Sequence, residues 1–425
     1  MYKAEVPLYG TLVDIVRSVD GSILAEQGKG AGSLPTRHEL ERHGAIRLGT
    51  QYELRTIKRL FAILGMYPVG YYDLGVLGFP LHATTFRPIT ERSLQKNPFR
   101  VFTTLLRKER LTREICDMVE LMLEQRKLFT RRLVEIIDHV EAGRAMTAQD
   151  ADDLLSEALK IFKWHSRSHF SMEEYLVMKQ IHPIVADISC FPSAHINHLT
   201  PRTLNIDFVQ KEMVRLGLPA KERIEGPPPR KCPILLRQTS FKALEEYILF
   251  DRADSNGIHN KGTHTARFGE VEQRGAAVTP HFPDSWAELR EQGLVFFQYR
   301  PTSAGLRFAK KSKVTLSQGQ HAGIEWLISR GLIECEPITY EDFLPFSAAG
   351  IFKSNVTEDP AEEDIRPETS LQGPDMENSN NSDLKELESS LGCKVYDVFL
   401  LYEAMQCKSI QDCEEALGLK DIVLS

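Results

Sequence analysis

The stretch RHGAIRLGT, residues 42–50, places a histidine and an arginine four positions apart in a largely apolar segment. A step of four residues brings His43 and Arg47 to the same side of either a strand or a helix. An imidazole next to a guanidinium is unfavourable when charged, but it is favourable when neutral and bound to a metal while Arg47 binds an anion. The alternative is a surface arginine beside a helix-capping histidine. The local pattern alone favours that alternative, because arginines are mostly exposed.

A second segment, SAHINHLTPR at residues 193–202, contains two more histidines. In a strand, His198 shares a face with Thr200, whereas His195 lies on the opposite face. The two rings therefore cannot both point into one cavity without a bulge. One histidine is a candidate metal ligand, and the other is a supporting or structural group.

A third segment, THTARFGEVEQRG, covers residues 263–275. Strand alternation places five of its side chains on one face, namely His264, Phe268, Glu270, Glu272 and Arg274. A solvated charged strand is the ordinary interpretation, but an interior glutamate would need a metal or an ion-pair partner. Two histidines and one carboxylate from separate segments form a facial triad that leaves three coordination positions open. Such a triad suits non-haem Fe(II) oxygen chemistry.

Composition excludes several classes of protein. The chain has 425 residues, of which 42% are apolar and 26% are charged, and its formal net charge is −7. These values are typical of a soluble globular protein of about two to three domains or of one large enzyme unit. The acidic balance leaves no basic excess for phosphates, so we do not expect nucleic-acid binding.

We expect a cytoplasmic protein that is not inserted in a membrane. No uncharged apolar run reaches the ~20 residues that span a bilayer, and the N-terminal stretch lacks the pattern of a signal peptide. The seven cysteines are odd in number and include no CxxC pair. This usage is typical of reduced thiols rather than of a disulfide framework or a cysteine zinc site.

Patterning along the chain predicts three parts. Residues 1–353 form a catalytic metal-binding unit, with a helical block inserted at about 111–180. Residues 354–384 are acidic and polar and contain prolines, so we expect a mobile loop that is dispensable for catalysis. Residues 385–425 return to helical patterning. Within the first part we predict a strand at IVADI (184–188) and a helix at FKALEEYILF (241–250). No internal sequence repeat is visible, although a diverged structural duplication would escape detection.

Five motifs in order resemble one family: HGAIRLGT, HINHLTPRTLNID, ILLRQTSFKAL, HTARFGEVEQRG and YEDFLPFSAAGIF. They are similar to the 2-oxoadipate dioxygenase/decarboxylase family, also called 2-hydroxyglutarate synthase. In addition, FGEVEQR is similar to the F-x-E-x-x-Q-R strand of 4-hydroxyphenylpyruvate dioxygenase, whose glutamate matches Glu270. The resemblance implies an α+β fold of the vicinal-oxygen-chelate type, with βαβββ modules in a curled sheet and many added helices.

The resemblance also implies roles for individual residues. The metal ligands would be His43, His198 and Glu270, and the metal would be Fe(II). Arg47 would bind a substrate carboxylate, while Phe346 and Ser347 would contact the substrate. The family commonly has a smaller aliphatic residue where Phe346 stands, which bears on the length of the substrate.

The implied reaction converts 2-oxoadipate and dioxygen to 2-hydroxyglutarate and carbon dioxide, a step of lysine catabolism. The small 2-oxoacid would bind the iron through its carboxylate and keto oxygens. One alternative within the superfamily is a non-redox isomerase or lyase that uses zinc or manganese as a Lewis acid. Another is an inactive binding protein with the same fold.

Overall fold

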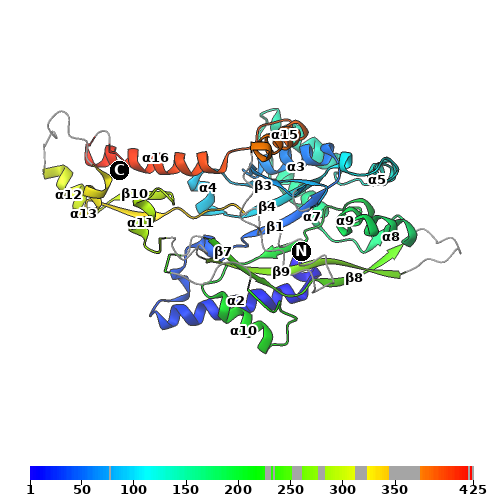
Figure 1. Cartoon of the computed structure of the whole chain (residues 1–425), viewed down its shortest axis with the longest axis horizontal. Helices are drawn as coiled ribbons and strands as arrows, with labels where there is room; N and C mark the ends of the chain where they lie inside the picture. The colour runs from blue at the N-terminus through cyan, green and yellow to red at the C-terminus, as the bar shows by residue number, and fades with distance from the viewer. Residues whose placement is uncertain are drawn as a thin grey trace. The chain divides into compact units, whose positions relative to one another are not determined.

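The structure is a computed structural model (Figure 1) that describes residues 1–75, 78–224, 231–232, 235–250, 261–275, 283–311, 323–343, 374–419 and 422–423. The chain divides into two compact units. The first consists of Met1–Gly226, Arg237–Gln273 and Phe343–Val395, and the second consists of Pro227–Leu236, Arg274–Asp342 and Tyr396–Ser425. The candidate site residues described below all belong to the first unit.

A βαβββ module follows directly from the first quoted stretch. It consists of β1 (His43–Leu48), α3 (Gln51–Ile63), β2 (Tyr67–Asp73), β3 (Leu81–Arg87) and β4 (Arg100–Leu106). The strand order is β2-β3-β4-β1, with β1 parallel to β4 and the other neighbours antiparallel. This arrangement confirms the predicted type of module.

The same succession of elements occurs a second time. It consists of β6 (His198–Thr200), α10 (Ile206–Arg215), β7 (Leu235–Ser240), β8 (Leu244–Phe250) and β9 (Lys261–Gly275). The first and last strands are again parallel, as β6 pairs with β9, and β8 is antiparallel to β9. Strand β7 differs from its counterpart β2, because it pairs with β9. The duplication was invisible in the sequence.

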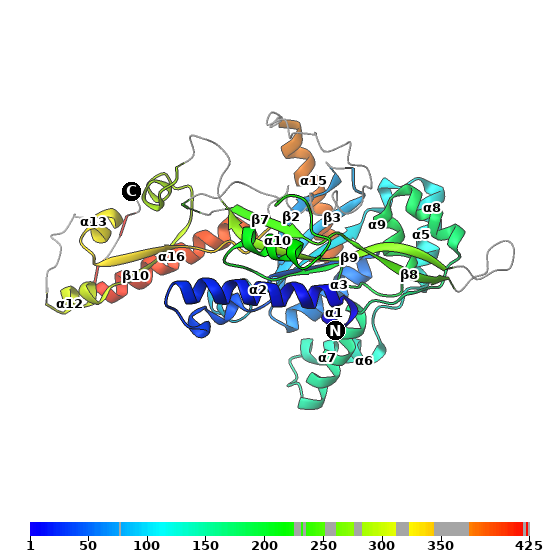
Figure 2. The same ribbon diagram turned by 90° about the horizontal axis from the view of Figure 1, so that it is seen from below.

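The two modules join into one sheet through antiparallel pairing of β1 with β6. In the described residues the sheet runs β2-β3-β4-β1-β6-β9-β8-β5, with β5 (Arg167–Ser168) at the edge and β7 beside β9. Figures 1 and 2 show α2 (Pro7–Glu26) and α10 side by side along the second module. Helix α3 packs on the first module, where Ile57 and Leu60 join Ile46 and Phe86 in one core.

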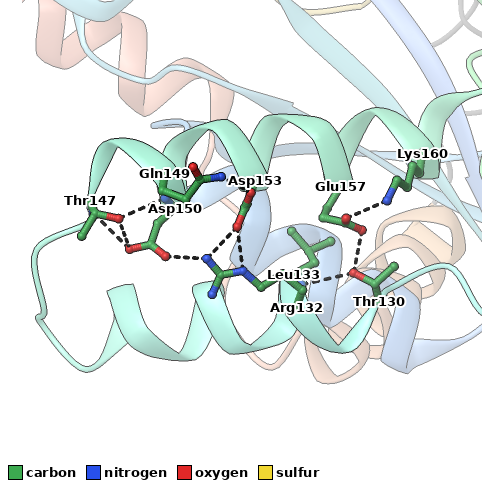
Figure 3. Close-up of polar contacts among 9 residues, drawn as sticks. All are labelled: Thr130, Arg132, Leu133, Thr147, Gln149, Asp150, Asp153, Glu157 and Lys160. Atoms are coloured by element: carbon green, nitrogen blue, oxygen red, sulfur yellow. Dashed lines mark hydrogen bonds and ion pairs between the residues drawn. The ribbon is translucent and has the colours of Figure 1, made fainter.

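The predicted helical block contains most of the remaining helices of the first unit. They are α5 (Arg113–Gln125), α6 (Arg131–Glu141), α7 (Ala148–Phe162) and α8 (Met172–Ile181), and they are followed by α9 (Pro183–Cys190). Short helices α1 (Tyr2–Glu5) and α4 (Glu91–Lys96) lie elsewhere in the same unit. Figure 3 shows that α6 and α7 are joined by Arg132, which donates to Asp150 and Asp153, and by Thr130, which donates to Glu157.

Two predictions of secondary structure are wrong: the segment predicted as a strand is a helix, and the segment predicted as a helix is mostly a strand. IVADI is part of α9, whose first residue is Pro183 and whose cap residue His182 accepts a hydrogen bond from the Ile184 backbone. Proline at the first helical position and a side-chain cap favour helix initiation. Most of FKALEEYILF forms β8, in which Ile248 and Phe250 are buried while Leu249 between them is exposed. This alternation marks a half-buried strand.

The second unit contains a two-stranded antiparallel sheet of β10 (Phe297–Pro301) and β11 (Ile333–Pro337). Around it lie α11 (Trp286–Glu291), α12 (Ser303–Lys311), α13 (Ile324–Ser329) and α16 (Val398–Leu417). Phe297, Leu327 and Cys413 belong to its hydrophobic core. In the described part of the chain, no helix is long and apolar enough to cross a membrane.

A buried ion pair anchors the carboxyl end of β1. The Glu53 carboxylate accepts hydrogen bonds from the Gly49 backbone at 2.7 Å and contacts Arg126 Nε at 3.2 Å. Arg126 in turn donates to the carbonyl oxygens of Arg47 and Ile188. The pair therefore connects β1, α3, α5 and α9 around Arg47.

Replacing Arg126 with methionine should lower the free energy of unfolding by about 3–5 kcal/mol, because the Glu53 carboxylate would stay buried without its cation. Urea denaturation measures this change. The matched control is Arg131→Met, which removes an exposed pair with Glu135 and should cost less than about 1 kcal/mol. Equal losses in the two variants would contradict the anchoring role of Arg126.

Candidate metal and substrate site

The site lies on the face of the first module that is turned away from α3, which we call the inner face. Alternate residues of the strands distinguish the two faces. Ala45, Ala83 and Phe102 belong to one hydrophobic core, whereas Ile46 and Val101 belong to the core beneath α3. By the same alternation, His43 and Arg47 lie on the inner face, as the sequence predicts.

The structure brings two of the predicted ligands together. His43 is the first residue of β1 and His198 is the first residue of β6, so they occupy equivalent positions in the two modules. Both side chains are buried. Their ring centroids are 5.2 Å apart, with an interplanar angle of 84°. Two buried imidazoles from different strands thus face one small region of the inner face.

Three neighbours hold the ring of His43. The Thr200 hydroxyl lies 3.0 Å from Nε2, and Arg100 Nη2 lies 3.4 Å from Nδ1. Phe343 packs edge-on against the imidazole, with ring centroids 4.7 Å apart, and the Arg100 guanidinium lies 4.2 Å from the Phe343 ring centre. Both ring nitrogens of His43 therefore lie within reach of a polar neighbour.

The third predicted ligand is located only by its strand. In the parallel pairing of β6 with β9, His198 is opposite Phe268 and Leu199 is opposite Gly269. Glu270 is the next residue of β9, adjacent to the strand of His198. Its side chain lies outside the described residues, as do Phe346 and Ser347.

His195 has a different environment from His198. Its Nε2 lies 3.3 Å from Asp187 Oδ1, and its ring packs edge-on against Trp164 with centroids 4.6 Å apart. The other oxygen of Asp187 accepts a hydrogen bond of 2.6 Å from Arg47. Asp187 therefore lies between His195 and Arg47, and all three side chains are largely buried.

Asp187 is the residue that sequence reasoning missed. It belongs to α9, in the segment predicted to be a strand. No local pattern indicates a link between Asp187 and Arg47, which are separated by 140 positions. A carboxylate in an otherwise apolar, buried helix was the available signal, since a buried charge needs a partner.

A separate group of charged residues surrounds Arg107. His82, Glu109 and Glu386 have potential metal-ligating atoms within 4.8 Å of one another. However, Arg107 contacts Glu109 at 2.8 Å and Glu386 at 3.0 Å, and it forms two hydrogen bonds with Asp383. Arg107 already pairs with these carboxylates, so the group is better described as an ion-pair cluster than as a cation site.

The protonation behaviour of this cluster agrees with that description. Burial, and then the charge of Arg107, lower the pKa of His82 to about 4, so its ring is neutral at pH 7. The hydrogen bonds from Arg107 lower the pKa of Asp383. Burial raises the pKa of Glu386. Asp383 is therefore the principal anionic partner of Arg107.

The prediction of a mobile loop at 354–384 is wrong for its last part, which contributes Asp383 to the Arg107 cluster. Helix α15 spans Pro374–Leu391, so residues 374–384 are helical. Leu387 and Leu391 are buried in the core beneath α3, and Asp383 joins Arg107. These contacts offset the ordering entropy that led us to expect a mobile segment. The part at 354–373 lies outside the described residues.

Comparisons with known proteins identify the family. A family model described as 2-oxoadipate dioxygenase/decarboxylase matches residues 1–281 and 280–355. The chain belongs to this family. A relative of that name from Pseudomonas putida is 41% identical, and the match covers 99% of this chain and 95% of the relative. Another from Escherichia coli K12 is 42% identical over 97% of this chain and 95% of its own length.

A solved structure confirms the predicted fold class. The hydroxyglutarate synthase from Pseudomonas putida in complex with 2-oxoadipate has a TM-score of 0.81 to this chain, at 39% identity. The likeness covers 99% of this chain and 96% of that one. The fold is thus α+β, with a curled mixed sheet built from βαβββ modules.

Asp383→Asn should lower the free energy of unfolding by about 1–3 kcal/mol at pH 7, because it weakens the charge-assisted bonds to buried Arg107. Since the pKa of Asp383 is lowered in the folded protein, its contribution is complete above about pH 4 and is lost as the pH falls further. Urea denaturation at several pH values tests this. Glu120→Gln, which removes the exposed partner of Lys108, is the control and should change little.

Proposed function

We propose that this protein is an Fe(II)-dependent dioxygenase/decarboxylase that converts 2-oxoadipate and dioxygen to 2-hydroxyglutarate and carbon dioxide. Membership of the family supports the reaction. The observation that carries the proposal is the adjacency of buried His43 and His198 on one inner face together with Arg47. All seven cysteines are free thiols, which supports a reducing compartment such as the cytoplasm.

The described donors fit a metal. His43 and His198 would hold it from the two modules, with Glu270 of β9 as the carboxylate ligand. Two imidazoles and one carboxylate are the ligand set of non-haem Fe(II) oxygenases. When bound, the iron would supply sites for the 2-oxoacid and dioxygen and would carry the oxidation. A ring nitrogen that binds the metal cannot also accept a hydrogen bond, so the metal would replace one of the two polar contacts of His43, with Thr200 at Nε2 or with Arg100 at Nδ1.

The contacts of the two candidate histidines favour His198 over His195 as the ligand. His198 faces the ring of His43, whereas His195 faces Asp187 and Trp164. The Nε2 atom of His195 is directed at Asp187, and no contact of its ring with His43 is seen among the described residues. We assign His195 to the support of Asp187, and through Asp187 to the position of Arg47.

Arg47 is suited to hold the second carboxylate of the substrate. It lies four residues along β1 from His43, which corresponds to about 13 Å between Cα atoms in a strand. Asp187 restrains the guanidinium from one side with a bond of 2.6 Å. A guanidinium can offer a carboxylate parallel hydrogen bonds, and it stays charged when buried.

Turnover after anaerobic loading with Fe(II) tests the proposed reaction. We expect 2-oxoadipate to cause oxygen uptake with equimolar release of carbon dioxide and 2-hydroxyglutarate. The same protein loaded with Zn(II) should consume no oxygen. Conversion of a 2-oxoacid without oxygen uptake would instead indicate the isomerase or lyase alternative. Binding of metal and substrate with no conversion at all would indicate an inactive binding protein.

Arg47→Ala should spare iron binding and lower kcat/KM for 2-oxoadipate about 30-fold to several thousand-fold, which corresponds to about 2–5 kcal/mol. Arg47→Lys should restore only part of this loss, since an ammonium lacks the planar fork. Steady-state kinetics and iron content measure the two effects. Arg17→Ala, which removes an exposed arginine of α2, is the control. A near-normal kcat/KM for Arg47→Ala would give Arg47 a purely structural role.

A further inference from the structure

Among the residues that the structure describes, two threonine hydroxyls on the inner face have no hydrogen-bond partner. Thr85 of β3 and Thr104 of β4 are fully buried, and the Oγ1 atom of each is without a partner among the residues that the structure describes. A buried polar group that stays unpaired costs free energy. Other buried groups, such as the Tyr9 hydroxyl, also have no partner among the described residues. The location of the two threonines must therefore show whether their hydroxyls bind a ligand.

The strand register places Thr104 next to Arg47 and Thr85 one strand further along the same face. Thr104 is directly opposite Arg47 in the parallel pairing of β1 with β4. On the other side of β4, Thr85 is opposite Phe102, and Thr104 is opposite Ala83. Thr85 and Thr104 are therefore diagonal neighbours on adjacent strands, with Cα atoms about 7–8 Å apart. Both share the inner face with Arg47.

The neighbouring threonines on the opposite face are satisfied within the protein. Thr84 Oγ1 donates to the Gly70 carbonyl oxygen at 2.7 Å, and Thr103 Oγ1 donates to the Val101 carbonyl oxygen at 3.2 Å. All four side chains are buried on the same two strands. The difference between the faces is thus not a property of threonine or of these strands. It is specific to the side that carries Arg47 and His43.

We propose that Thr104 and Thr85 are substrate-contacting residues that select a dicarboxylic 2-oxoacid. Their hydroxyls would donate hydrogen bonds to the terminal carboxylate held by Arg47. A carboxylate has about four lone-pair positions, and a bidentate guanidinium uses two of them, which leaves acceptors for both hydroxyls. A terminal methyl group would leave the hydroxyls unpaired, so a monocarboxylic acid would be disfavoured. This inference rests on the function proposed above.

Valine substitutions test the inference, because valine keeps the shape of threonine and removes the hydroxyl. For Thr104→Val and Thr85→Val we expect kcat/KM for 2-oxoadipate to fall about 10- to 100-fold each, mainly through KM. The value for 2-oxohexanoate, which has a terminal methyl group, should stay unchanged. The melting temperature of the unliganded protein should stay equal or rise, since the lost hydroxyl had no partner.

Thr103→Val is the matched control, as it removes a buried hydroxyl on the same strand but on the opposite face. It should lower the melting temperature and leave the ratio of the two substrates unchanged. If Thr104→Val instead behaves like this control, the hydroxyl is structural and the inference is wrong.

A second measurement separates this inference from the proposed reaction. Adipate has the same terminal carboxylate but no keto group, so its binding needs no turnover. It should raise the melting temperature of the wild-type protein and raise it less in Thr104→Val, while Thr103→Val should respond as wild type does. If adipate raises the melting temperature of Thr104→Val as much as that of Thr103→Val, the inference is wrong. Failure of wild-type turnover with 2-oxoadipate would overturn only the reaction.

Discussion

Antiparallel pairing of β1 with β6 is the interaction on which the candidate site depends. It places His43 opposite Thr200 and Gly44 opposite Leu199, and so it joins two βαβββ modules at their first strands. A Cβ atom on Gly44 would lie 3.0 Å from Leu199 Cδ2 and 3.3 Å from the His198 carbonyl oxygen. The absence of a side chain at Gly44 allows this approach. Each module then contributes its first residue, a histidine, to the same region.

Buried charges hold the other end of β1. Glu53 and Arg126 bond to the backbone on both sides of Leu48 and to the carbonyl oxygen of Ile188. Asp187, the preceding residue of α9, bonds directly to the Arg47 side chain. β1 and α9 are therefore fixed relative to each other at the position of the Arg47 side chain. Such pairs contribute little net stability compared with apolar packing, but removal of one partner is costly. Their main effect here is to position Arg47.

The sequence contained the local part of this arrangement. The four-residue step between His43 and Arg47 predicts that the two side chains share a face, whether the segment is a strand or a helix. Alternation in SAHINHLTPR predicted different environments for His195 and His198. The structure does give them different contacts, but β6 begins only at His198, so strand alternation is not the cause. The motifs also predicted the α+β fold class, which the comparisons confirm.

The remaining features depend on contacts between distant segments. The duplication is visible only in the pairing of strands, since the two modules share topology but no evident sequence. Asp187 and Asp383 find their arginines across 140 and 276 positions, and no periodicity encodes such a pairing. Helix α9 appeared strand-like because every one of its residues after Pro183 is buried. A short, mostly apolar run fits both kinds of element.

We propose that the first residues of β1 and β6 hold one metal ion. Anaerobic Fe(II) binding to His43→Ala, His198→Ala and His195→Ala, followed by dialysis and measurement of bound iron, tests it most directly. We expect the first two variants to lose the iron, whereas His195→Ala should retain one ion per chain, with folding checked by circular dichroism. Retention of iron by a folded His198→Ala protein, together with its loss from His195→Ala, would contradict the claim.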